Sequence, residues 1–172
     1  SQRNIEPDIE SWLALDLING LGDESMRCLL AAFGSPAAIL SASMTSLERV
    51  VKRKVADNII GGADPQKLNA SLKWLEDPQN SVITLADPDY PALLLNIPDP
   101  PPLLYVKGKR GLLNTPMLAI VGSRNATPQG LSNAEAFAEA TSNAGFCIAS
   151  GMALGVDAAA HRGGLRGRAS SV

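Results

Sequence analysis

The first 80 residues show short stretches of helical hydrophobic spacing separated by polar turns. Over residues 9–17, apolar side chains fall at positions 9, 12, 13, 15 and 17, which is the spacing of a helix with one buried side. A second helix is expected over residues 25–33, because acidic residues precede it and a Gly-Ser-Pro sequence ends it. Further helices are predicted over residues 36–40, 46–60 and 65–76. The pattern therefore predicts a small helical module covering about residues 1–80.

From residue 81 onward, short β-branched and apolar runs replace the helical spacing. Residues 82–85 and 103–106 predict two strands, and a proline-rich connection joins them. Residues 117–121 are apolar without interruption, as expected for a strand that is buried on both faces of a sheet. These runs indicate a second domain over about residues 81–172.

The last third of the chain alternates strands with helices. After residue 121, Thr127 and Pro128 predict an N-cap and a first helical position, and Gly145 predicts the end of that helix. Another strand is expected over residues 146–149 and another helix over about residues 156–161. This order predicts an α/β fold with a Rossmann-like parallel sheet, preceded by the helical module.

Composition and charge narrow the functional classes. The chain has 172 residues and a formal net charge of −2, which argues against a protein that coats nucleic acid by bulk charge. Residues 1–99 carry 8 Lys/Arg and 14 Asp/Glu, and residues 100–172 carry 7 and 3, so the two parts have net charges of −6 and +4. An anionic ligand is therefore expected on the C-terminal part.

The two cysteines, Cys28 and Cys147, lie in apolar runs and are expected to be buried free thiols. The chain has a single histidine, His161, and lacks paired Cys-x-x-Cys spacing, so we expect no zinc site and no bound cofactor. No signal peptide and no long apolar run is visible. The expectation is a soluble protein of the reducing cytoplasm.

Two glycine-containing loops follow the predicted parallel strands, and they are the candidate phosphate site. One contains Gly122, Ser123 and Arg124, and the other begins with Ser150 and Gly151. In open α/β sheets ligands bind outside the carboxyl ends of the strands, where glycine backbones can present N–H groups to phosphate oxygens. The serine hydroxyls add donors, and a guanidinium matches phosphate geometry.

Other interpretations of these residues stay open. The glycines can serve only the tight turns from strand to helix, and neither a G-x-G-x-x-G nor a G-x-x-x-x-G-K-[ST] motif is present. Asp157 and His161 are spaced i, i+4 on one helix face and could form an acid–base pair. A carboxylate that caps the helix start, beside an unrelated polar contact of the histidine, is the favoured interpretation. No catalytic residue is therefore predicted.

The turn at residues 19–22, Asn-Gly-Leu-Gly, resembles the hairpin of a helix-hairpin-helix or SAM-like unit. Glycines in such a hairpin let the backbone approach a DNA phosphate. The module is acidic and the hairpin itself holds no lysine or arginine, so a plain tight turn between helices is the favoured interpretation.

Several motifs together, in this order, resemble the DprA/Smf family of bacterial DNA-processing proteins of natural transformation. They are Tyr90-Pro91 to Lys107-Gly108, residues 119–124 (Ala-Ile-Val-Gly-Ser-Arg), and residues 150–157 followed by Ala160-His161. The helical module is also similar to that family's leading domain, so the resemblance covers about residues 9–168.

The resemblance implies an extended Rossmann domain that binds single-stranded DNA, protects it and passes it to the RecA recombinase, without known catalysis. Matched by motif, Gly122, Ser123 and Arg124 would belong to the DNA-phosphate loop, with Ser150 and Gly151 beside it. Family members continue through further strands and helices, with more DNA contacts and a dimer surface. The sheet can therefore be incomplete here, which leaves the homodimer and the RecA contact open.

The predicted function is sequence-independent binding of single-stranded DNA, in competence and DNA recombination. The main alternative is a nucleotide phosphoribohydrolase-like enzyme on a related fold, whose P-G-G-x-G-T segment is absent from these residues. A protein–protein adaptor built on the helical module is the third possibility. No nucleotide hydrolysis and no metal requirement are expected.

Overall fold

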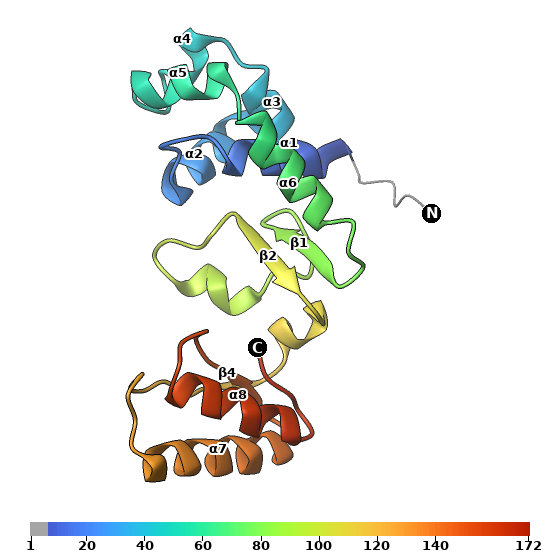
Figure 1. The fold of residues 1–172 in the computed structure, drawn as a ribbon. Coiled ribbons are helices and arrows are strands. Elements are labelled where there is room, and N and C mark those ends of the chain that lie inside the picture. Colours follow the sequence, from blue (N-terminus) through green and yellow to red (C-terminus); the bar gives the residue numbers. More distant parts are fainter. Residues whose placement is uncertain (1–6) are drawn as a thin grey trace. The chain divides into compact units, whose positions relative to one another are not determined.

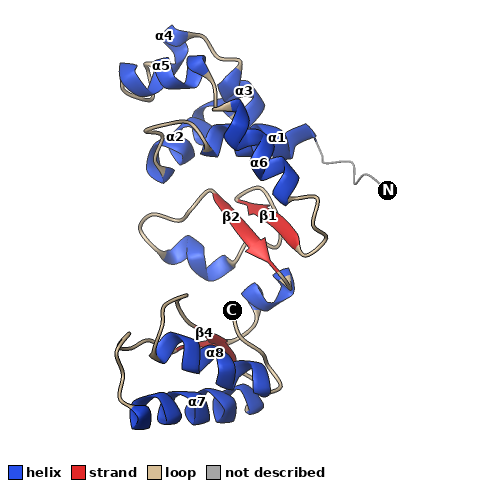
Figure 2. Ribbon diagram, in the orientation of Figure 1, coloured by secondary structure: helices blue, strands red, loops and turns tan. Residues whose placement is uncertain are grey.

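The structure is a computed structural model that describes residues 7–172, and it divides into two compact units. Unit 1 ends at Arg110 and unit 2 begins at Gly111. Figure 1 follows the chain through both units, and Figure 2 shows that helices and short strands occur in each unit. Each unit is described separately.

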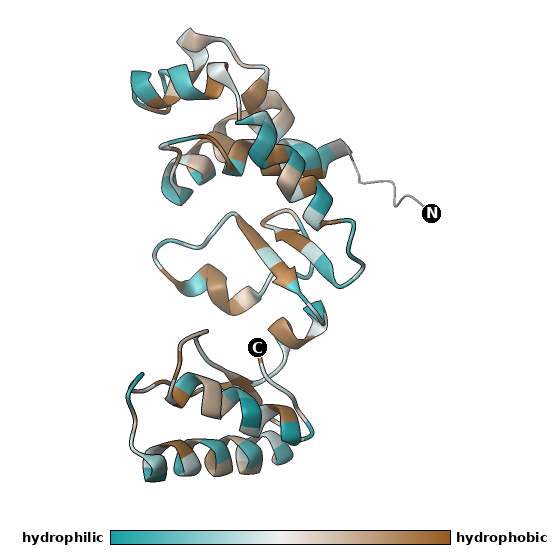
Figure 3. Ribbon diagram, viewed as in Figure 1, coloured by the Kyte–Doolittle hydropathy of each residue, from teal (hydrophilic) through white to brown (hydrophobic). Residues whose placement is uncertain are grey.

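The described part of unit 1, residues 7–110, begins with six helices, and three of them start at a capping side chain. Ser35, Ser43 and Asp64 each accept a hydrogen bond from a backbone N–H two or three residues further on, which satisfies a donor that the helix leaves unpaired. Brown and teal residues alternate along these helices in Figure 3, as expected for amphipathic helices around one core. The helices are α1 (Pro7–Asp16), α2 (Asp23–Phe33), α3 (Pro36–Leu40), α4 (Met44–Leu47), α5 (Arg53–Gly61) and α6 (Pro65–Trp74).

The single helical stretch predicted over residues 46–60 is wrong, because it consists of two helices. α4 ends at Leu47, and Lys52 is extended before α5 begins. The buried side chains explain the break: Leu47 and Val51 are four residues apart, but the next buried residue, Ala56, follows five residues later. A continuous helix could not turn all three toward one core.

The two strands of unit 1 are β1 (Asn80–Thr84) and β2 (Leu103–Lys107), and they form an antiparallel pair. Between them lies a 3-10 helix, η1 (Ala92–Asn96). Val82 and Leu103 belong to the same buried core as the helices. The Tyr105 hydroxyl donates to Asp16 on α1 (3.1 Å), and its ring packs edge-on against Trp74 of α6 at 5.6 Å between centroids.

These contacts explain why unit 1 extends past the predicted domain break at residue 80. The strand pair completes the core of the helical module, so the compact unit includes it. Burial of the Asp16 carboxyl raises its pKa, and the hydrogen bond from Tyr105 opposes that shift. The chain reaches unit 2 through a second 3-10 helix, η2 (Arg110–Asn114).

Unit 2 contains a small parallel sheet, as the order of its elements predicted. Strand β3 (Met117–Ala119) pairs in parallel with β4 (Cys147–Ala149), and Ile148 forms a parallel bridge with Ser171 on the other side of β4. Helix α7 (Pro128–Asn143) connects the two strands, and α8 (Val156–Arg166) follows β4. Figure 1 shows α7 and α8 packed side by side, and both contact β4. The Rossmann-like arrangement is confirmed.

The capping predictions for unit 2 are confirmed, since Thr127 accepts from the Gly130 N–H (3.1 Å) and Gly145 has a φ of +100°. The prediction that residues 117–121 are buried on both faces is wrong. The strand ends at Ala119, and Val121 is 78% exposed. α7 and α8 pack mainly on β4 and on each other, which leaves the side chains of β3 partly exposed.

Only one of the two cysteines is buried. Cys147 lies in β4 with no exposed surface, and this burial raises the pKa of its thiol. Cys28 is exposed, contrary to prediction. On α2 the buried positions are Met26 and Leu29, and a residue directly before Leu29 is rotated by about 100° away from that face.

Candidate phosphate-binding site

The two predicted loops lie together at one edge of the unit 2 sheet. Residues 122–125 follow β3 and residues 150–155 follow β4, and because these strands are parallel, their carboxyl ends share an edge. The backbone N–H of Val156 donates to the Ser123 carbonyl (3.1 Å), which ties the second loop to the first. The structure therefore brings all five predicted site residues into one region.

Glycines make this close approach possible. Gly155 has a φ of +82°, and a Cβ there would collide with the backbone carbonyls of Ser123 and Arg124. A Cβ on Gly122 would lie 2.8 Å from the Val156 side chain, and one on Gly151 would lie 2.5 Å from the Asp157 carboxylate. These three glycines thus have a packing role in joining the loops, whatever ligand the loops hold.

The first loop presents backbone donors for which residues 7–172 supply no acceptor. Among residues 7–172, no acceptor is found for the N–H groups of Gly122, Ser123 and Arg124. The Ser123 hydroxyl oxygen accepts from the Asn125 N–H (3.1 Å), which holds the loop in a tight turn. Three consecutive N–H groups in a loop that leads into α7 are therefore available to an anion.

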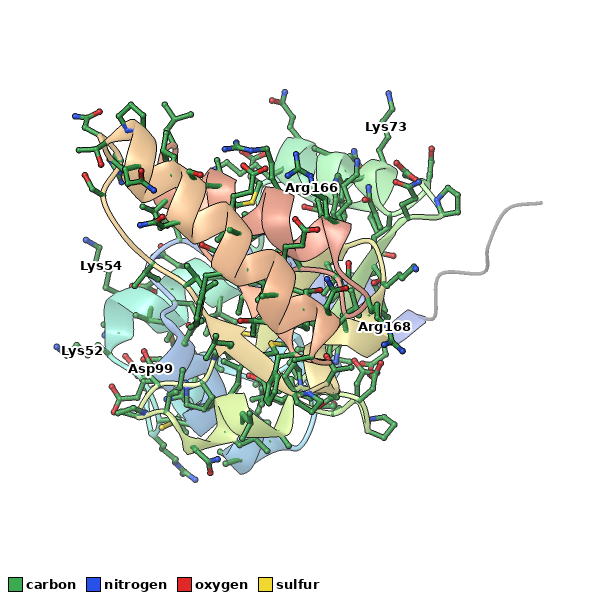
Figure 4. All side chains as sticks on the ribbon, turned by 90° about the horizontal axis from the view of Figure 1, so that it is seen from below. Lys52, Lys54, Lys73, Asp99, Arg166 and Arg168 are labelled. Carbon is green, nitrogen blue, oxygen red and sulfur yellow. The ribbon has the colours of Figure 1, made fainter. Side chains whose placement is uncertain are left out.

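The Arg124 side chain is exposed, and its guanidinium forms no ion pair or hydrogen bond with any residue that the structure describes. An ion pair with Asp157, the buried carboxylate at the start of α8, would have made Arg124 a structural residue, and no such pair is formed. The basic side chains at the end of α8 differ, because Arg162 and Arg166 both bind Glu135, and the hydrogen bond from Arg162 lowers the pKa of that carboxyl. Figure 4 shows Arg166 on α8 and Arg168 just beyond it.

Ser150 differs from the other predicted residues, since both of its donors are used inside the protein. Its N–H donates to the Val172 carbonyl (3.1 Å), and its hydroxyl donates to the Ile120 carbonyl (2.6 Å). Ser150 therefore links three segments of the chain, and only its hydroxyl oxygen is still available to a ligand, as an acceptor. Gly151 keeps an N–H without an acceptor among residues 7–172.

His161 and Asp157 do not form an acid–base pair. Nε2 of His161 donates to the Gly151 carbonyl (3.0 Å), and Nδ1 shares a hydrogen bond with the Ser171 hydroxyl (2.7 Å). Both ring nitrogens thus hold the second loop and the C-terminal segment in place. Ser171 could not be predicted as a partner of His161, because only the folded sheet brings the two residues together.

Asp157 is 8% exposed in the first turn of α8, and no hydrogen bond to its carboxylate is found within residues 7–172. The predicted capping bond is therefore not formed, although a negative charge is favourable at that position of a helix. The same charge repels a second anion there. Of the two loops, residues 122–125 are consequently the better phosphate site.

Three apolar side chains surround these loops. Val121, Met152 and Leu154 are 78%, 96% and 79% exposed. Sequence reasoning missed them, because hydrophobicity alone predicts burial and only the folded structure shows that nothing among residues 7–172 covers them. A flexible apolar surface beside an anion cradle suits a ligand that carries both phosphates and flat rings.

Comparison with known proteins decides the family. The profile of the DNA recombination-mediator protein A family matches residues 81–172, which is more than half of the chain. The chain belongs to the DprA/Smf family. The match to the family profile begins at residue 81, where the strand pattern begins in the sequence. The division between the two compact units comes later, after Arg110.

Individual relatives agree with this assignment. Protein Smf of Synechocystis is 34% identical over 165 residues, and Protein Smf of Escherichia coli is 32% identical over 161 residues. These alignments cover 90% and 92% of this chain but 40% and 42% of the relatives, so the chain spans less than half of their length. DNA processing protein DprA of Streptococcus pneumoniae is 40% identical over 83 residues.

A solved structure supports the fold. The X-ray structure of DNA processing protein A from Streptococcus pneumoniae matches 87% of this chain and 51% of its own, with a TM-score of 0.67 and 26% identity. The likeness of the turn at residues 19–22 to a helix-hairpin-helix unit stays a prediction. Among the described residues, none of the helices combines the length and apolarity needed to cross a bilayer.

Proposed function

We propose that this chain binds single-stranded DNA without sequence preference, and that the backbone of residues 122–124 and the Arg124 side chain hold a phosphate. The observation that carries the proposal is a set of three consecutive N–H groups and an exposed guanidinium in the same loop, none of which has a partner within residues 7–172. Donors in that state are available to phosphate oxygens and need not give up an existing bond.

A single strand fits this surface better than a duplex. The site is small, and no helix rich in Arg, Asn or Gln is available as a recognition helix among residues 7–172. The exposed Val121 directly precedes the first loop, and the exposed Met152 and Leu154 belong to the second, so unpaired bases can contact them. In a duplex the bases are stacked inside and could not reach these side chains.

The names of the relatives support a role in DNA processing for recombination and transformation, and we extend that role to this chain as part of the proposal. Contact with the RecA recombinase and homodimer formation are carried over from the family resemblance. We propose no catalysis, since both nitrogens of His161 are engaged in structural hydrogen bonds and no basic side chain pairs with Asp157 within residues 7–172.

The test is fluorescence anisotropy of the 172-residue chain with a labelled oligonucleotide, as a single strand and as the matched duplex. We expect tighter binding of the single strand, with affinity that falls as salt increases. Equal or tighter binding of the duplex would contradict the proposal. A parallel incubation with nucleoside monophosphates checks the enzymatic alternative, because release of free base by the pure protein would favour a phosphoribohydrolase.

A further inference from the structure

Unit 1 carries a cluster of basic residues that plays no part in the candidate phosphate site of unit 2. Residues 1–99 contain 8 Lys/Arg, and four of them, Arg49, Lys52, Arg53 and Lys54, fall within six consecutive positions. None of the 14 Asp/Glu of residues 1–99 lies between positions 49 and 54. The most basic segment of the chain therefore lies inside its most acidic part, and we call residues 49–54 the basic segment.

The fold turns these four side chains outward. The neighbouring apolar residues Leu47, Val51 and Ala56 are buried in the core of unit 1, which fixes the orientation of the turn and of α5. All four basic residues are exposed, and Figure 4 shows Lys52 and Lys54 extending away from the cyan ribbon of α5. The core thus anchors the backbone from which the charges project.

The charges of the basic segment are barely neutralised within the protein. Arg53 approaches Glu48 at 3.8 Å, but its side chain is 78% exposed, so this pair contributes little. No ion pair of Arg49, Lys52 or Lys54 is found among residues 7–172. At least three positive charges therefore remain available to an external anion.

Helix α5, which begins within the basic segment, contacts the glycine-containing turn at residues 19–22. The Asn58 side chain on α5 donates to the Asn19 carbonyl (2.8 Å), and its nitrogen would lie 3.8 Å from a Cβ placed on Gly20. Lys54 precedes Asn58 by four residues, so the two share one face of α5. An extended anion lying across Lys52 and Lys54 would consequently pass close to the exposed backbone of this turn.

We propose that the basic segment is a second contact for the phosphate backbone of DNA, on unit 1 and separate from the loops of unit 2. Several cations without an aromatic or apolar anchor between them match a regularly spaced polyanion. An acidic protein surface is the less suitable partner, because the centres of protein interfaces are depleted of charge and rich in apolar contacts. This proposal deepens the proposed DNA-binding function and rests on it.

The experiment compares two double variants of the 172-residue chain that lose the same charge. Lys52→Gln/Lys54→Gln removes two charges from the basic segment, and Lys67→Gln/Lys73→Gln removes two exposed lysines from α6 as the matched control. Affinity for a single-stranded oligonucleotide is measured at several salt concentrations. We expect the first variant to bind about two- to thirtyfold more weakly. The log–log salt slope should fall by about 1.4, or 0.7 for each lost phosphate contact.

Three outcomes separate this proposal from the proposed function. If Arg124→Gln weakens binding while the two double variants behave alike, the second contact is refuted and the function stands. If only Lys52→Gln/Lys54→Gln weakens binding, the second contact stands and the assignment of residues 122–124 is refuted. Absence of DNA binding by the unmodified chain would overturn both.

A competition assay addresses the acidic-protein alternative. Unlabelled oligonucleotide and polyglutamate of equal charge are titrated against the labelled complex, and the double variants are repeated with each competitor. The assignment to DNA would be overturned if polyglutamate competed as strongly as DNA and if this competition were lost in Lys52→Gln/Lys54→Gln. Unchanged melting temperatures of both double variants show that the effects arise at the surface.

Discussion

Replacement of Arg124 tests the proposed phosphate site most directly. The guanidinium is exposed and has no ion pair within the described residues, so its removal should not cost stability in the unbound protein. In the complex, Arg124→Gln should remove a charge-assisted hydrogen bond worth roughly 1.5–3 kcal/mol. That loss corresponds to about a ten- to hundredfold decrease in affinity for single-stranded DNA. Arg124→Lys should recover only part of the affinity, because an ammonium keeps the charge but cannot bind two phosphate oxygens in parallel as a planar guanidinium does.

The assay combines anisotropy at several salt concentrations with a thermal melt of each variant. Loss of one phosphate contact should reduce the log–log salt slope by about 0.7 for a single strand. The melting temperature should stay unchanged. A lower melting temperature of the variant with an unaltered salt slope would refute the role of Arg124 in phosphate binding. Arg124 would then stabilise the loops, and other groups would bind the phosphate.

Gly155→Ala should destabilise unit 2 by roughly 1–3 kcal/mol in a denaturant titration, because φ is +82° and the new Cβ would meet the Ser123 carbonyl; an unchanged midpoint would show that the loops separate easily. Burial raises the pKa of Asp16 in the folded protein above its ordinary value of 3.8. The free energy of unfolding should therefore fall as the pH rises from 3.8 through the pKa of the folded state. Asp16→Asn should therefore raise the melting temperature at pH 7 and have no such effect below about pH 3.8. A chain that ends at Arg110 should melt cooperatively and at a higher temperature than one that ends at Asp77, which lacks the buried Val82 and Leu103. Equal melting temperatures would show that the strand pair adds nothing to unit 1.

The sequence determined the features that depend on neighbouring residues. Thr127-Pro128 and Ser35-Pro36 predicted two helix starts correctly, because a capping side chain acts within three residues. Gly145 marked a helix end for the same local reason. The order of strands and helices after residue 116 predicted the parallel sheet, and this order placed Gly122 to Arg124 at its carboxyl edge.

Tertiary structure decided the features that depend on residues far apart in the sequence. The break between α4 and α5 and the exposure of Cys28 follow from which side of each helix the core covers. Ser150 resembled a ligand residue, but its donors bind Ile120 and Val172, which the sheet brings beside it. The Arg124 side chain forms no ion pair with a carboxylate of residues 7–172, and such a pair depends on the packing of loops, which local propensity does not specify.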